Sequence, residues 1–186
     1  MKKISSFLTL LAILTAEISS VQANPAPEFT KYLPEIQSKI SFGLVMRLPK
    51  KIQLDQSVKE PLIIKIFTSG TPANLTVGLF KCDRALTSCF LGSFAVARKE
   101  SPIAKQELLR HQTIGDKITL KQNIRGYLIE GKEQEPIYSF SSLMWQQEDM
   151  IYTITFPGKE RKNILFMGYS MANNPICISR KGNIKC

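Results

Sequence analysis

Residues 138–173 decide the fold, and they read YSFSSLMWQQ, ED, MIYTITF, PG and KERKNILFMGYSMAN. Over 150–156 two sets of residues alternate strictly: Met150, Tyr152, Ile154 and Phe156 on one side, and Ile151, Thr153 and Thr155 on the other. This period of two is typical of a half-buried antiparallel strand. The acidic pair before this strand predicts a tight turn from a second strand, 138–147. Pro157-Gly158 ends the hairpin, and over 159–173 the period changes to that of an amphipathic helix.

The part of the chain before this hairpin is rich in strand patterns. Short apolar runs bounded by turn residues predict further strands at 41–48, 61–67, 74–81, 90–97, 117–121 and 124–130. A weak helical pattern covers 25–38, where Pro34 breaks or restarts the helix. The predicted fold class is α+β: a curved antiparallel sheet of about 7–9 strands, with one internal helix and a C-terminal helix packed on one face.

The internal helix begins at Ser101-Pro102, which joins a capping hydroxyl to a proline at the first helical position. It is expected to end before Gly115. Its apolar stripe is Ala104, Leu108 and His111, with charged residues on the other faces. His111 is therefore interpreted as a partly buried or capping side chain at the end of a core-facing stripe.

The first 23 residues have the pattern of a cleaved secretory signal peptide: a basic start, the apolar run 4–16 and small residues before Asn24. Glu17 stops the run short of the roughly 20 residues that a membrane span needs, and an uncleaved anchor is the alternative. We expect an exported bacterial protein, periplasmic or secreted. Residues 24–186 are expected to form a single α+β domain, with 175–186 as a basic tail bracketed by cysteines.

The cysteine content fits export, because all four cysteines follow the predicted signal peptide. Four cysteines allow three pairings, and the sequence does not choose among them. The simplest pairing is local. It joins Cys82 to Cys89 across a predicted hairpin of the strands 74–81 and 90–97, and it joins Cys177 to Cys186. A zinc site is the alternative, but the spacings lack a CxxC pattern and His111 is the single histidine, so no metal is expected.

The formal net charge of +10 is unusual for 186 residues, and the basic residues are spread along the chain. Export argues against nucleic acid as a partner and favours an anionic envelope surface: membrane phospholipid, lipopolysaccharide or cell-wall polymer. A basic protein without an anionic partner is the alternative. The small basic clusters that could make such contacts are Lys50, Lys51, Arg161, Lys162, Arg180, Lys181 and Lys185.

Signatures of catalysis are missing from the sequence. It contains no GxSxG nucleophile elbow, P-loop or GxGxxG motif, so neither catalytic residues nor a cofactor are expected. An enzyme would have to use carboxylates or His111, and it would need a cleft that holds His111 beside a carboxylate.

Five aromatic side chains could line an apolar pocket for a lipid or a lipoprotein acyl chain, although aromatics at these spacings are also typical of a core. They are Trp145, Tyr152, Phe156, Phe166 and Tyr169.

Three segments in the last third of the chain form a pattern found in other proteins: IRGYL (124–128), SLMWQQEDMIYTI (142–154) and NILFMGYSMAN (163–173). These segments resemble exported proteins of cyanobacteria and, more distantly, a domain found in bacterial lipoproteins and anti-sigma-factor regulators. That wider group is compared with the half-barrel of the lipoprotein carrier LolA and the sensor RseB. The resemblance implies a fold but no catalytic residues, and this chain lacks the lipid-attachment cysteine of the lipoproteins.

The sequence therefore predicts an exported, non-catalytic protein that binds or interacts with the cell envelope. Two alternatives stay open. One is a periplasmic carrier or sensor with an apolar cavity for lipid or lipoprotein acyl chains. The other is an enzyme that uses carboxylates or His111.

Overall fold

A computed structural model describes residues 25–54, 61–69, 73–83, 87–133, 139–173 and 176–184. The predicted signal peptide, Lys185 and Cys186 lie outside these ranges. Within the described residues, no helix combines the length and the apolar character that a membrane crossing requires.

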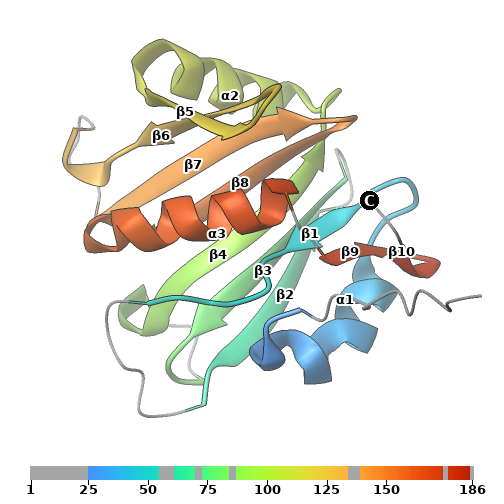
Figure 1. The fold of residues 1–186 in the computed structure, drawn as a ribbon. Coiled ribbons are helices and arrows are strands. Elements are labelled where there is room, and N and C mark those ends of the chain that lie inside the picture. The colour runs from blue at the N-terminus through green and yellow to red at the C-terminus, as the bar shows by residue number, and fades with distance from the viewer. Residues whose placement is uncertain are drawn as a thin grey trace, which may run out of the picture.

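The centre of the molecule is an antiparallel seven-stranded sheet, the main sheet, in the order β2-β3-β4-β8-β7-β6-β5 (Figure 1). Two meanders, β2 to β4 and β5 to β8, meet where β4 pairs with β8. The helix α2 (Pro102–Ile114) crosses from one meander to the other. The strands are β2 (Ile63–Ser69), β3 (Asn74–Phe80), β4 (Phe90–Arg98), β5 (Asp116–Lys121), β6 (Ile124–Ile129), β7 (Phe140–Gln147) and β8 (Met150–Pro157).

The N-terminal helices, α3 and a small second sheet pack against one face of the main sheet. A small sheet joins β1, β9 and β10 in that order. The bounds are η1 (Pro27–Tyr32), α1 (Leu33–Lys39), β1 (Met46–Leu48), α3 (Arg161–Asn173), β9 (Ile176–Ser179) and β10 (Gly182–Ile184), and the short 3-10 turns are η2 (Thr87–Cys89), η3 (Gly131–Glu133) and η4 (Gly158–Glu160).

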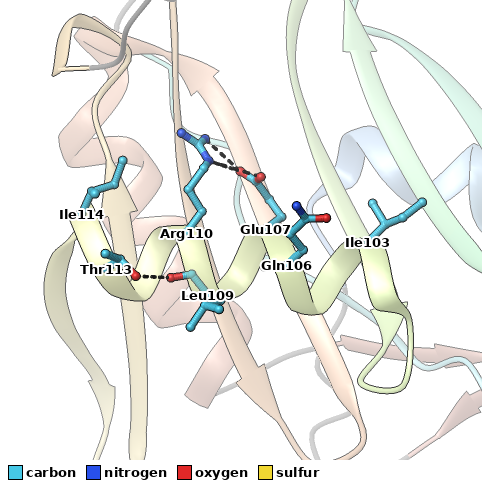
Figure 2. A pocket seen from close by; sticks show the side chains of 7 residues that line it. All are labelled: Ile103, Gln106, Glu107, Leu109, Arg110, Thr113 and Ile114. Carbon is cyan, nitrogen blue, oxygen red and sulfur yellow. Dashed lines mark hydrogen bonds and ion pairs between the residues drawn. The ribbon is translucent and has the colours of Figure 1, made fainter.

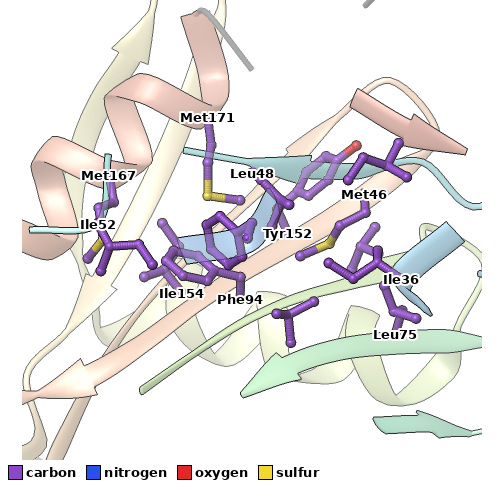
Figure 3. Packing of buried hydrophobic residues seen from close by; sticks show 14 of the residues in the cluster. Ile36, Met46, Leu48, Ile52, Leu75, Phe94, Tyr152, Ile154, Met167 and Met171 are labelled. Carbon is purple, nitrogen blue, oxygen red and sulfur yellow. The ribbon is translucent and has the colours of Figure 1, made fainter. Parts of the chain in front are cut away.

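The main core lies between this face and its covering elements (Figure 3). Leu143 and Ile154, which pair across the β7–β8 hairpin, project into it, and we call their side of the sheet the α3 face. Trp145 stacks on Tyr152 with 5.3 Å between ring centroids. Gly168 lets α3 approach closely, because a Cβ there would lie 2.5 Å from Cδ2 of Leu143.

The other side of the sheet, the α2 face, carries a smaller apolar cluster. Leu108 of α2 packs there on Met144 and Ile151. Met144 follows Leu143 and Ile151 precedes Tyr152, so the side chains next to these core residues point to the opposite face. The two helices therefore lie on opposite faces of the sheet, whereas we expected them on the same face. The period of two shows that side chains alternate between faces, but it does not say which face each helix covers.

Most predicted elements are confirmed, including the α+β class, both hairpins and the capped internal helix. Ser101 accepts a hydrogen bond from the Ala104 N–H at 3.3 Å. The strand predicted at 41–48 is shorter and covers only Met46–Leu48. A turn precedes it, in which Gly43 has φ +79° and the Leu44 N–H bonds to the Ser41 carbonyl.

The Cys82–Cys89 disulfide is present at the end of the β3–β4 hairpin, with 5.5 Å between the Cα atoms. Beside it the Lys81 N–H donates to the Cys89 carbonyl at 2.9 Å. Cys177 is also disulfide-bonded. Its predicted partner, Cys186, lies outside the described residues, so that pairing stays a prediction.

Candidate functional site

A groove of about 390 Å³ lies on the α2 face, between α2 and the strands that α2 leaves uncovered. Its volume is in the range of sites that hold small ligands. The lining residues are Ser69, Asn74, Thr76, Ala95, Val96, Ala97, Ser101, Ile103, Ala104, Glu107, Met144, Ile151 and Thr153.

The floor of the groove is hollow because three of its side chains, Thr76, Ala95 and Thr153, are small. Thr76, Ala95, Thr153 and Met144 lie opposite one another across β3, β4, β8 and β7. Met144 packs under α2, so the row runs out from beneath the helix onto open sheet. Alternation places these residues on one face, while larger neighbours such as Phe94 and Tyr152 fill the core.

The outward side of α2 carries three exposed aliphatic side chains, Ile103, Leu109 and Ile114, which we call the aliphatic ridge. Ile103 and Ile114 project to one side of the helix axis and Leu109 projects to the other (Figure 2). The exposed fractions of Ile103, Leu109 and Ile114 are 71%, 62% and 57%. Gln106, Arg110 and Thr113 lie between them in a shallow depression along the helix. We did not predict this ridge from the sequence, since we assigned charged residues to every face of α2 except the buried stripe. The available signal was three large aliphatics outside that stripe.

Two residues belong to both the groove and the outward depression, Ile103 and Glu107. The Glu107 carboxylate pairs with the Arg110 guanidinium, Nη2 to Oε1, at 2.9 Å. The groove and the ridge are therefore parts of one continuous surface.

Exposed cations flank this surface. Lys105 is exposed on α2 itself. Lys117 pairs across β5–β6 with Tyr127, which packs against the Leu108 cluster, so Lys117 lies on the α2 face. Arg125 pairs with Thr119 and donates to its hydroxyl, which places it on the same face.

His111 is fully buried where α2 meets β7. Its Nδ1 lies 2.9 Å from the Glu107 carbonyl oxygen, and its Nε2 lies 2.7 Å from Oγ of Ser142. Because a carbonyl can only accept, Nδ1 donates, and Nε2 of the neutral ring accepts the Ser142 hydroxyl. Burial lowers the pKa of this imidazole from its ordinary 6.5, and the nearby Glu107 opposes that shift. The ring is thus held neutral between helix and strand.

Ser142, His111 and Glu107 together have the order of a nucleophile, a base and an orienting carboxylate. Nδ1 lies 3.3 Å from the Glu107 carboxylate, but the main-chain carbonyl of the same residue is closer. The imidazole is 1% exposed, and among the described residues neither His111 nor Ser142 lines the groove. The geometry is that of a polar contact that fixes α2 on β7.

A second buried polar contact closes the α3 face, and no sequence pattern pointed to it. Arg47 of β1 binds the Glu148 carboxylate at 2.8 Å and donates through Nε to the Tyr152 hydroxyl at 3.2 Å. Its Nη1 reaches the Met171 carbonyl at 3.4 Å. Burial raises the pKa of the Tyr152 phenol to about 12, so the hydroxyl stays protonated and donates to the Val45 carbonyl.

The structure does not bring the five predicted pocket aromatics together. Trp145, Tyr152 and Phe156 are fully buried in the core. Phe166 and Tyr169 project outward from α3, with exposed fractions of 45% and 44%.

The predicted basic contacts are also dispersed. Arg161 is engaged by Asp116 and Glu130, whereas the side chains of Lys50, Lys51, Lys162, Arg180 and Lys181 are exposed. Lys185 lies outside the described residues. No group of three His, Cys, Asp or Glu residues in the described ranges could hold a metal ion.

These features define an α+β protein with one covered and one partly open sheet face. Comparison of the chain with protein-family models, with curated proteins and with solved structures finds no match. The resemblance of the last third therefore stays an expectation.

Proposed function

We propose that this protein is a non-catalytic, exported binding protein of the cell envelope, and that it binds its partner through the α2 face. The observation that carries the proposal is the pairing of the 390 Å³ groove with the exposed aliphatic ridge on one surface. Ile103 lines the groove, and Leu109 and Ile114 lie further along the same helix. Exposed large apolar side chains beside a concavity are typical of interaction sites.

The partners of His111 support a non-catalytic role. Both ring nitrogens are engaged in contacts that hold α2 on the sheet. A carrier with an internal cavity has less support. The three aromatics best placed to line such a cavity, Trp145, Tyr152 and Phe156, instead pack in the core beneath α3.

The proposal is tested by site-specific photo-crosslinking in bacteria that export the full-length chain. Photoreactive p-benzoylphenylalanine replaces Leu109 on the ridge in one variant and Phe166 on α3 in the other. Both positions are exposed apolar sites on helices of 13 residues, so they are matched in setting. We expect an envelope component to crosslink at position 109 and not at 166. Crosslinks at 166 alone, or at neither position, would contradict the proposal.

A further inference from the structure

We infer that the envelope component is the surface of an anionic phospholipid bilayer, and that α2 lies in its interface with the aliphatic ridge inserted. This inference rests on the proposed function, since it names the partner of the same face. It depends on the chemistry of the ridge, on the charge around it and on a comparison with α3.

The ridge places exposed aliphatic side chains along the whole outward side of α2. Ile103, Leu109 and Ile114 span α2 from end to end, a length of about 20 Å for 13 residues (Figure 2). Gln106, Arg110 and Thr113 lie between them, so the individual aliphatic side chains, and not a continuous apolar face, would enter the boundary of headgroups and acyl chains. Protein-binding hot spots instead favour tryptophan, tyrosine and arginine in packed pockets. The composition of the ridge therefore favours lipid over a protein partner.

The charge around the ridge complements an anionic surface. In the described part of the chain, Lys105, Lys117 and Arg125 make no ion pair with a carboxylate. The carboxylates nearby are Glu107, which is paired with Arg110, and Glu100 ahead of the helix. Cations therefore outnumber anions on this face, and basic residues near a bilayer are attracted to anionic headgroups.

The outward side of α3 is the rival surface, because Phe166 and Tyr169 lie there near Lys162. Each of these aromatics is less exposed than any residue of the ridge. Arg161 at the start of α3 is neutralised by Asp116 and Glu130. The α2 face thus offers the more strongly exposed apolar side chains. Exposed lysines without an ion pair to a carboxylate occur on both sides of the described molecule, so the comparison depends on the apolar side chains and not on the number of charges.

The test is co-sedimentation of the purified exported protein with vesicles, either of phosphatidylcholine alone or of phosphatidylcholine mixed with phosphatidylglycerol. We expect binding only to the anionic vesicles. Leu109→Gln should lower the partition coefficient about tenfold, the loss expected when one aliphatic side chain no longer leaves water. Phe166→Gln is the matched control and should change it less than about twofold. Both variants share the same N-terminal residues, so a difference between them comes from the exchanged side chain.

A second pair of variants tests the charge. Lys117→Gln combined with Arg125→Gln should weaken binding about tenfold. Lys50→Gln combined with Lys51→Gln removes the same net charge from another surface and should have little effect. Equal losses in the two pairs would indicate attraction by net charge alone and would overturn the inference.

The remaining outcomes separate this inference from the proposed function. Absence of binding to anionic vesicles, or a larger loss with Phe166→Gln than with Leu109→Gln, contradicts the lipid surface. If the crosslinker at 109 nevertheless captures an envelope protein or polymer, the α2 face is still the binding face and only the identity of the partner was wrong. If no envelope component crosslinks at position 109, both the lipid inference and the proposed function are contradicted.

Discussion

The two faces of the main sheet are built from the same strands, yet they bury very different side chains. On the α3 face Leu143, Trp145 and Ile154 pack under α3 and the small sheet. On the α2 face the same strands present Met144 and Thr153, and only α2 covers them. Because side chains alternate along a strand, one sequence can specify a closed face and an open face independently.

The polar contacts on the two faces differ in the same way. Arg47 joins β1, the β7–β8 turn and the end of α3, and so ties three elements together. On the α2 face His111 and Ser142 join only one helix to one strand. The α3 face is therefore expected to carry most of the stability, and the α2 face is free to bind.

The largest expected difference between the faces comes from removing side chains. Trp145→Ala empties the core beneath α3 and should lower the free energy of unfolding by about 3–5 kcal/mol. Thr153→Ala, on the adjacent strand but in the groove, should change it by no more than about 0.5 kcal/mol. Urea denaturation measures both. Similar losses for the two variants would mean that the faces do not differ in packing.

A smaller difference is expected from adding side-chain atoms. Gly168→Ala should lower the free energy of unfolding by about 1–2 kcal/mol, since its Cβ would meet Leu143 while better helix propensity offsets part of the loss. Ala95→Val adds more atoms, but to the open floor of the groove, and should cost less than about 0.5 kcal/mol. The control is a circular dichroism spectrum that matches the parent. A costly Ala95→Val would show that the groove floor is packed.

The smallest expected effect is a pH dependence that belongs to the α2 face. Burial lowers the pKa of His111 from 6.5 in the folded protein, so the unfolded chain binds more protons there. The stabilisation by neutral His111 is complete above pH 6.5 and is lost as the pH falls below that value. Glu130, with a pKa below its ordinary 4.5, contributes only at lower pH. We expect His111→Gln to remove the slope of unfolding free energy against pH just below 6.5. If the slope is the same in His111→Gln as in the parent protein, the claim that His111 is neutral in the folded state is wrong.

The sequence predicts the regular parts of this fold because periodicity is a local property. The alternation from Met150 to Phe156, the cap at Ser101 and the cysteine-bracketed hairpin each depend on neighbours in the chain. The contacts of Arg47 were not predictable in this way, since its carboxylate partner is 101 residues distant. The groove likewise arises from a row of small residues on separate strands, and no local pattern brings them together.

The ridge on α2 is an intermediate case. Its three aliphatics were visible in the sequence, but an apolar residue on a helix is ordinarily assigned to the core. Only the placement of α2 shows that Ile103, Leu109 and Ile114 face away from the sheet. The part of the molecule that we propose to be functional was therefore the part that the pattern of the sequence described least well.

The central claim is that the α2 face, and not the α3 side, contacts the envelope. Hydrogen–deuterium exchange of the purified protein, with and without bacterial envelope membranes, tests this claim most directly. The account predicts added protection in the peptide that covers α2, residues 102–114, and unchanged exchange in the peptide that covers α3, residues 161–173. Added protection confined to α3, or none in either peptide, would contradict it.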